Sequence, residues 1–400
     1  MDTGKLTGIL QKISFLKTYS PLIIPLLIVG IGVGIFGFTY AMSINLKKEV
    51  NKESTVYGKN IASLMNSIPS KEQWKEEQKY QEAMAKDAER ISLLPKETTQ
   101  RELLSYKIFP KPRETSRAIF QEFSRNYRKS IEAMIVQLNA RDCPTQAEIN
   151  RLVGSKSRVS STKGSSEMKD EYCKNRAKSI SVYANPADVA GYTFWEDYAD
   201  KTLADCWYWQ LGYWIIEDVF KTLDAMNYGS DSVFTSPVKR IVKVDFKQSD
   251  SYSFGLSDSG SKSLSSPPQY ITTASEQFTP SFTARLSNEE QDVVHFNVSV
   301  ILDAEAIPRF MKELCSAKQH TFKGFSGTEE EKIFKHNQIT ILKMSVNPVT
   351  REAQQHQLYR YGNSPVIQLD LICEYIFIKA GYEQIKPEVT KIKKATAKGS

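Results

Sequence analysis

Three glycines near the N-terminus, Gly32, Gly34 and Gly37, form the G-x-G-x-x-G pattern that holds dinucleotide phosphates in many enzymes. In those enzymes the pattern follows a strand and opens a helix whose N-terminus faces water. Here it lies inside an uncharged run, 21–42, made almost entirely of Leu, Ile, Val, Gly, Phe and Ala. These surroundings exclude a phosphate-binding loop.

Carboxylates and histidines are the other side chains that could do acid–base chemistry. Glu217 and Asp218 are adjacent on a predicted helix, where neighbours point about 100° apart, so we expect a solvated edge rather than a paired-carboxylate site. The four histidines stand apart in the sequence, and we expect surface positions for them: His295, His320, His336 and His356. The chain also lacks the G-x-x-x-x-G-K-[ST], G-x-S-x-G and H-E-x-x-H motifs. The sequence therefore predicts a protein without catalytic residues, not an enzyme.

The five cysteines show no metal-binding spacing, because the chain has neither a C-x-x-C pair nor a suitably spaced histidine. Three of them occupy apolar positions of predicted elements and are expected in the core: Cys206, Cys315 and Cys373. Cys143 and Cys173 flank a polar segment and could form a disulfide in an oxidising compartment; the sequence does not show whether their backbones come close. No metal or other cofactor is expected.

The uncharged run near the N-terminus is long enough to cross a membrane. A hydrocarbon core of about 30 Å requires about 20 helical residues, and we predict a transmembrane helix over 21–43. A signal peptide is the alternative, but its apolar core is shorter, at about 7–15 residues, and no good cleavage site follows Met42. Lysines flank both ends, and we expect the short arm, 1–20, inside the cell and the bulk outside.

Two further patterns predict contacts with a second helix. Gly30 and Gly34 form a G-x-x-x-G pair, which lets two helix backbones approach closely in lipid, although glycine is also common in membrane helices generally. Beyond the membrane, apolar residues recur at heptad-like intervals of four, seven, four and three: Leu46, Val50, Tyr57, Ile61 and Leu64. These seven positions are the predicted interface.

More helices are expected before the next domain. Ser70 with Gln73 forms a capping box for a polar helix over 71–92. Another helix begins near Pro112 and carries apolar residues at spacings of three and four. We predict a helical, coiled-coil stalk over 44–150, with a compact helical bundle as the alternative.

The rest of the chain predicts an α+β domain over 191–382, preceded by a flexible Ser/Lys-rich linker over 151–190. The domain's elements, in the order helix, strand, strand, helix, strand, strand, are expected over 206–226, 238–246, 294–302, 307–314, 338–347 and 366–378. Two such α-β-β units predict one antiparallel sheet with both helices on one face, a ferredoxin-like arrangement rotated in order. A Ser-rich insertion, 249–281, is expected to be a loop, and 383–400 a disordered basic tail.

Composition limits the partners. The net charge of +7 is mild for 400 residues, and much of the excess comes from the tail, so no nucleic-acid partner is expected. Hydrophobic residues make up 40% and charged residues 25%, which is ordinary for globular material outside a membrane. Because the sequence shows no set of polar residues typical of a binding pocket, no small-molecule substrate is expected either.

The order of these parts resembles the inner-membrane alignment proteins of type IV pili, the PilN and PilO kind, and their type II secretion counterparts. The most similar local stretches are 210–227 followed by 236–241, and 307–311 leading to 339–342, which look like the helix-to-strand steps of planctomycete and verrucomicrobial PilO-like proteins. This chain departs from that pattern in being about twice as long and in carrying Ser-rich insertions.

The resemblance implies a protein that connects other proteins. Its partner would be a second copy or a PilN-like paralogue, contacted through the membrane helix, the coiled coil and the sheet domain. It would lie in a bacterial inner membrane, with the N-terminus in the cytoplasm and the bulk in the periplasm. A membrane-anchored extracytoplasmic sensor or ligand-binding protein is the alternative, and a membrane-anchored hydrolase is a third possibility.

Overall fold

The computed structural model describes residues 20–67, 70–97, 99–114, 116–156, 162–195, 202–248, 266–336 and 338–391. It divides into two compact units, Met1–Ala88 and Glu89–Ser400. Among the described residues, the first unit contains helices alone, and every strand belongs to the second. The mixture of helices and an antiparallel sheet agrees with the α+β class expected from the sequence.

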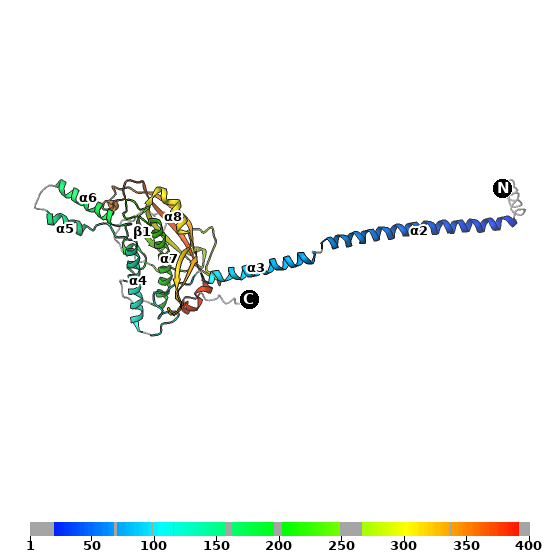
Figure 1. Ribbon diagram of the computed structural model, residues 1–400, viewed down its shortest axis with the longest axis horizontal. Coiled ribbons are helices and arrows are strands. Elements are labelled where there is room, and N and C mark those ends of the chain that lie inside the picture. Colours follow the sequence, from blue (N-terminus) through cyan, green and yellow to red (C-terminus); the bar gives the residue numbers. More distant parts are fainter. Residues whose placement is uncertain are drawn as a thin grey trace, which may run out of the picture. The chain divides into compact units, whose positions relative to one another are not determined.

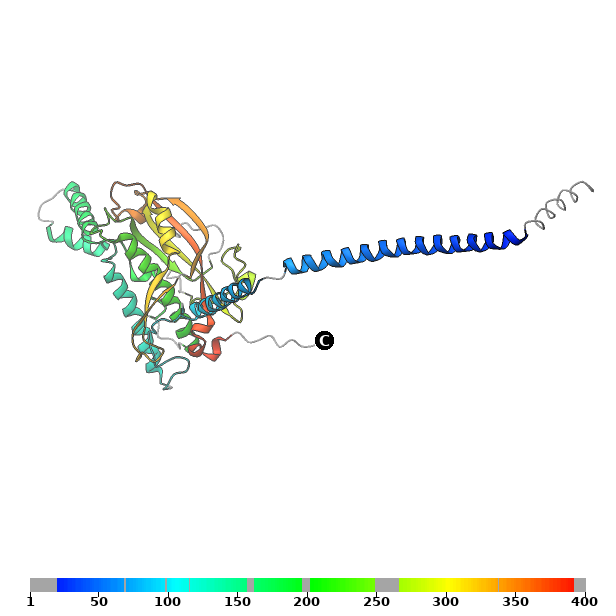
Figure 2. The same cartoon turned by 45° about the vertical axis from the view of Figure 1, so that its right-hand side comes forward.

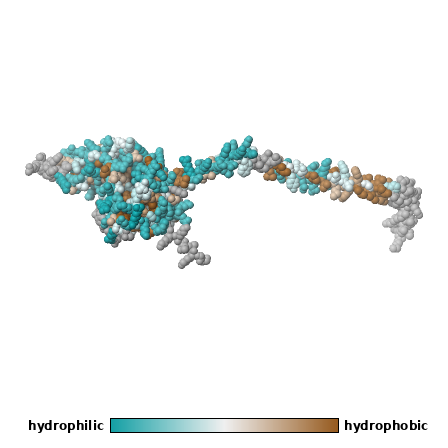
Figure 3. Space-filling model, turned by 60° about the horizontal axis from the view of Figure 1, so that its bottom comes forward, coloured by the Kyte–Doolittle hydropathy of each residue, from teal (hydrophilic) through white to brown (hydrophobic). Residues whose placement is uncertain are grey.

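The first unit contains one long helix and most of another. Helix α2, Ser20–Ser67, runs for 48 residues, and its side chains are exposed from Pro25 to Leu64. Figure 3 shows its most apolar residues gathered toward its N-terminal end. By length and composition α2 is the one helix in the described chain that could cross a membrane, a property that anchors and signal sequences share. The predicted span, 21–43, lies within it, whereas residues 1–19 of the expected arm are outside the described residues.

Helix α3, Lys71–Glu97, begins at the predicted capping box. The Ser70 amide donates to Gln73 Oε1 at 2.7 Å, and the Gln73 amide donates to Ser70 Oγ at 3.2 Å. These bonds satisfy amides that the first turn of a helix leaves unpaired. The helix continues past its expected end at 92, and the boundary between the two units falls within it.

A four-stranded antiparallel sheet in the order β1-β2-β6-β5 organises the second unit. Its strands are β1 (Val238–Asp245), β2 (Gln291–Asp303), β5 (Ile339–Pro348) and β6 (Val366–Ile378). The central strands pair along their whole length, from Gln291 opposite Ile378 to Asp303 opposite Val366. Period-two alternation predicted all four strands; it missed the separate hairpin of β3 (Lys318–Phe322) and β4 (Lys332–His336).

Helices α7 (Leu203–Asn227) and α8 (Ile307–Leu314) cover one face of this sheet (Figures 1 and 2). Beneath them, alternate residues of the central strands form the core: Val294, Phe296, Val298, Val300, Leu302, Leu369, Leu371, Cys373, Tyr375 and Phe377. A capping box between Thr202 and Asp205 starts α7. The residues predicted for its apolar face are buried, and so are Trp209, Ile216 and Phe220 on its other sides. Helix α7 is therefore covered on most sides, whereas Asp224 and Ala225 near its C-terminal end are exposed.

The outer cover of α7 is α4, Arg117–Gln137, which lies alongside it (Figure 1). Apolar residues of α4 join the same core: Ile119, Phe123, Tyr127, Ile131 and Ile135. This differs from the stalk expected over 44–150, because the chain belongs to the compact second unit from Glu89 onward. The apolar spacing of α4 follows the expected pattern, but its stripe packs against α7 rather than along a coiled coil.

The linker expected over 151–190 is also part of the second unit. It contains the end of α5 (Gln146–Lys156) and α6 (Thr162–Ser179), followed by a buried segment beside the outer edge of β1. Parallel bridges join Tyr183 to Arg240 and Val189 to Val244. The folded unit thus begins well before the expected start at 191, and this segment covers an edge that would otherwise offer unpaired backbone groups.

Part of the Ser-rich insertion expected over 249–281 is ordered as well. Tyr270 is buried and forms an antiparallel bridge with Val294 of β2. Farther along, Thr283 and Arg285 each donate to the buried Glu374 carboxylate at 2.8 Å, on the sheet face opposite α7. Residues 249–265 are outside the described ones.

The tail expected over 383–400 is anchored as far as Lys391, beyond which lie residues outside the described chain. Its anchor is Lys386, whose ammonium is fully buried and paired with the equally buried carboxylate of Asp292. Lys379 approaches the same carboxylate at 3.4 Å, and Tyr382 Oη donates to it. The sequence around Lys386 could not predict this buried ion pair, because its partner Asp292 lies almost a hundred residues earlier.

We expect Lys386→Met to lower the free energy of unfolding of the second unit by about 2–3 kcal/mol, because the buried Asp292 carboxylate keeps the Tyr382 hydroxyl but loses the nearer of its two cations. Urea unfolding of the full chain, followed by tryptophan fluorescence, measures this, since four tryptophans are buried in this unit: Trp195, Trp207, Trp209 and Trp214. The control is Lys312→Met at an exposed position, which should change stability by less than about 0.5 kcal/mol. Equal effects of the two substitutions would contradict the anchoring role.

Candidate functional site

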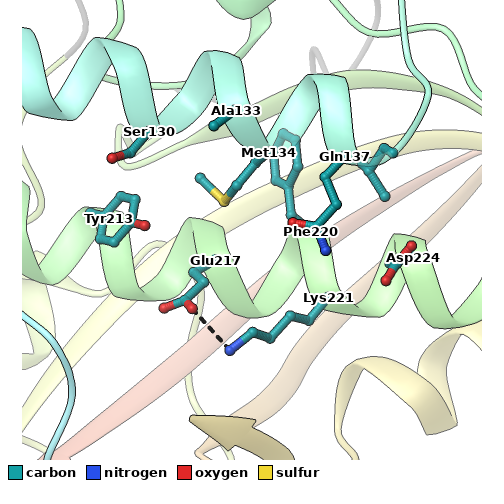
Figure 4. A pocket seen from close by; sticks show the side chains of 10 residues that line it. Ser130, Ala133, Met134, Gln137, Tyr213, Glu217, Phe220, Lys221 and Asp224 are labelled. Carbon is teal, nitrogen blue, oxygen red and sulfur yellow. Dashed lines mark ion pairs between the residues drawn. The ribbon is translucent and has the colours of Figure 1, made fainter. Parts of the chain in front are cut away.

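The second unit has a groove of about 240 Å³ where α4 and α7 run side by side (Figure 4). Both helices point the same way along the groove, so that Ser130 lies near Tyr213 and Gln137 lies toward the Asp224 end. The lining residues are Ser130, Ala133, Met134 and Gln137 from α4, Leu138 directly after it, and Tyr213, Glu217, Phe220, Lys221 and Asp224 from α7.

Aromatic packing fixes the two helices at the start of the groove. Tyr127 of α4 makes edge contacts with Trp209 and Tyr213 of α7, at ring-centroid distances of 5.7 and 6.3 Å. Its hydroxyl donates to the Ala190 carbonyl at 2.7 Å, which satisfies a group that burial would otherwise leave unpaired. Past these rings, the short side chain of Ala133 leaves space between the helices.

Behind the groove, Asp218 is at the centre of a buried polar network. Arg101 donates to its Oδ2 at 2.6 Å, and Tyr375 Oη donates to the same oxygen at 2.9 Å. His320 Nε2 lies 2.8 Å from Oδ1. The network therefore ties four parts of the second unit together: the segment after α3, helix α7, strand β3 and strand β6.

Glu217 connects this network to the groove. Its carboxylate pairs with Lys221 at 2.9 Å, and Lys221 also donates to the Gln319 carbonyl at 2.7 Å. The Lys221 ammonium also lies 2.9 Å from His320 Nδ1. Burial alone would raise the pKa of Glu217, but the hydrogen bond to His320 and the charges of Lys221 and Arg101 outweigh it and bring that pKa to about 2.

These positions correct two expectations from the sequence. Asp218 is buried, not part of a solvated edge, because α7 is enclosed between the sheet and α4. Three of the histidines expected at the surface are also buried, His295, His320 and His356; the side chain of His336 lies outside the described ones. Polar neighbours in the sequence suggested exposure, whereas in the fold each of the three has polar partners or aromatic contacts.

Asp218 has three polar partners, a guanidinium, a hydroxyl and an imidazole, and these contacts hold its side chain in place. Within the described residues, no group of three or more His, Cys, Asp and Glu side chains is arranged to hold a metal ion.

The predicted interface residues of α2 are all exposed where their side chains are described. Leu46, Val50, Tyr57, Ile61 and Leu64 are between 58% and 63% exposed, and a Cβ built at Gly30 or Gly34 would have nothing within 4 Å. At about 100° per residue, the five apolar residues fall within an arc of about 60°. Gly30 and Gly34 lie roughly 150–170° from its centre, so the two patterns occupy nearly opposite faces of one helix. Both remain predicted interfaces.

The two cysteines considered for a disulfide are free thiols in the structure. Cys173 is buried on α6, and burial raises the pKa of its thiol. Cys143 is half-buried near Tyr359, and burial raises the pKa of its thiol to about 11. Both sulfurs are therefore protonated at neutral pH and react slowly with disulfides.

No family model and no curated protein matches this chain. A crystal structure of a protein from Akkermansia muciniphila is similar with a TM-score of 0.24 and 9% identity, covering 69% of this chain and 83% of that one. A structure from the same organism without its transmembrane region has a TM-score of 0.24 and 8% identity, covering 69% and 91%. A core-domain crystal structure gives 0.22 and 9%, covering 69% and 94%. Scores at this level do not establish a shared fold.

The low pKa of Glu217 gives a testable pH dependence. A carboxylate whose pKa falls from 4.5 in the unfolded chain to about 2 in the folded one stabilises the fold above about pH 4.5, and the stabilisation is lost as the pH falls toward 2. Between about pH 5 and pH 3, wild type should lose about 1–2 kcal/mol more stability than Glu217→Gln. Urea unfolding at the two pH values, with exposed Glu305→Gln as the control, measures the difference; parallel losses in wild type and Glu217→Gln would contradict it.

Proposed function

We propose that this protein is a non-enzymatic, membrane-anchored scaffold that aligns or assembles other proteins, of the PilO and PilN kind. One observation carries the proposal: α2 is a single helix that is apolar enough to cross a membrane and then continues with an exposed apolar stripe. A helix with such a stripe is typical of coiled coils, in which a second helix covers it. The same helix, α2, would therefore supply both the membrane anchor and the surface that contacts a partner helix.

The stripe has a physical reason to be covered. The stripe lies beyond the most apolar part of α2, and more than half of the surface of each of these side chains is exposed: Leu46, Val50, Tyr57 and Ile61. Removing apolar surface from water stabilises a complex by about 25 cal/mol per Å². Because these side chains share one narrow face, a single neighbouring helix could cover all of them. We propose that this neighbour is a second copy of the chain or a PilN-like paralogue.

The sheet supports the same proposal. The order β1-β2-β6-β5, with helices α7 and α8 preceding the two strand pairs, is the order expected of a ferredoxin-like sheet whose elements are rotated. Strand β5 ends the sheet, and Met344 and Val346 on it are almost half exposed. An edge strand with exposed apolar side chains can pair with a strand of another chain.

The proposed location is a bacterial inner membrane, with a cytoplasmic N-terminus and a periplasmic second unit. Uncleaved retention of α2 is part of this proposal, since a signal sequence has the same length and composition. An extracytoplasmic sensor or ligand-binding protein is less well supported. The α4–α7 groove, at about 240 Å³, is below the roughly 300–1,000 Å³ of typical small-molecule pockets.

Cysteine crosslinking in membranes tests the stripe. We expect oxidation to trap an adduct, either a homodimer or a heterodimer with a membrane partner, in full-length Val50→Cys and Tyr57→Cys, because these positions would face the neighbouring helix. Matched controls are Lys52→Cys and Lys59→Cys, which lie roughly 150–170° from the stripe's centre on the same helix. The parent chain, with its five cysteines, gives the background. Equal trapping at stripe and control positions, or trapping at none, would contradict the proposal.

A further inference from the structure

The α4–α7 groove carries an acidic group that the fold does not neutralise. Asp224 lines the groove, is exposed, and forms no ion pair with a basic residue of the described chain. Lys221 is the nearest lining cation, but its ammonium is engaged by Glu217, the Gln319 carbonyl and His320. Figure 4 shows the Lys221 side chain extending toward Glu217 and away from Asp224. The Asp224 end of the groove is therefore negative.

The two helices add to this negative potential. Because α4 and α7 run in the same direction, their C-terminal ends, at Gln137 and Asn227, lie toward the same end of the groove. The C-terminus of a helix carries about half a negative charge, which basic residues in the last turn usually offset. Neither α4 nor α7 has a basic residue in its last turn.

Much of the rest of the groove is apolar. Its lining includes Ala133, Met134, Leu138 and Phe220. An apolar channel that ends at a carboxylate matches a side chain with an apolar stem and a cationic head.

We propose that this groove binds a lysine or arginine side chain of a partner polypeptide. The aliphatic stem would lie on Met134 and Phe220, and the cation would face Asp224 and the two helix ends. The volume of about 240 Å³ accommodates one long side chain rather than a whole small molecule. This inference goes beyond the proposed scaffold function and stands on a different part of the chain.

The test uses the full chain in lipid nanodiscs and a probe peptide, acetyl-Ala-Leu-Arg-Leu-Ala-amide. Saturation-transfer difference NMR measures its affinity against the matched peptide in which citrulline, an isosteric neutral residue, replaces arginine. We expect the arginine peptide to bind about threefold to fivefold more tightly, the effect of one partly exposed charge pair, and to weaken as salt is raised.

Three variants locate the binding. Asp224→Asn removes the charge at constant size and should remove most of the preference for arginine over citrulline. Ala133→Phe fills the groove from an exposed helix position and should weaken both peptides. Glu305→Gln, an exposed acid elsewhere in the unit, should leave the affinities unchanged. Unchanged unfolding midpoints show that the variants are folded.

Equal binding of the two peptides, an arginine preference that Asp224→Asn leaves unchanged, or no binding at all would overturn the proposal. Tighter binding of a peptide with glutamate in place of arginine would overturn it too. These outcomes are separate from the crosslinking of α2, because the groove and the stripe share no residue. A negative result in the peptide-binding test would not affect the scaffold proposal, and a negative result in the crosslinking test would not affect the groove proposal.

Discussion

The enclosure of α7 is the constraint on which the second unit depends. The sheet covers one side of this helix and α4 much of the other, so every buried polar group on it must find a partner inside the protein. Asp218 is the critical case, since an unpaired buried carboxylate would cost several kcal/mol. Its partners Arg101, His320 and Tyr375 come from three separate parts of the unit, so pairing this one charge also fixes the positions of those parts.

The same enclosure explains the groove. Aromatic contacts set the distance between α4 and α7 near Tyr127, and the smaller Ala133 then leaves the helices partly uncovered. Glu217 and Lys221 lie where the buried network meets the opening, so each neutralises the other. Asp224 lies past them and has no such partner in the described chain. The groove between α4 and α7 therefore has an exposed carboxylate, that of Asp224, at one end.

Local patterns predicted the elements of the sheet domain well, because period-two and helical spacing act over a few residues. The buried faces of β2, β6 and α7 follow directly from this spacing. Tertiary partners could not be predicted in the same way. The apolar stripe of α4 would be the same in a coiled coil and in a helix packed on α7. Asp218, His320 and Lys386 are polar, so the sequence predicted exposed positions for them; their partners in the fold lie about 100 residues away in the sequence. Of the candidate sites, the stripe on α2 is evident in the sequence, whereas the groove depends on the pairing of two distant helices.

The central claim is that α2 stays in the mature protein as an anchor for a module that works by contact. Intact-mass analysis of the protein isolated from membranes after alkaline carbonate washing tests this most directly. The account predicts a membrane-retained chain that still contains residues 21–43. A freely soluble protein whose mass shows that this segment has been removed would contradict it.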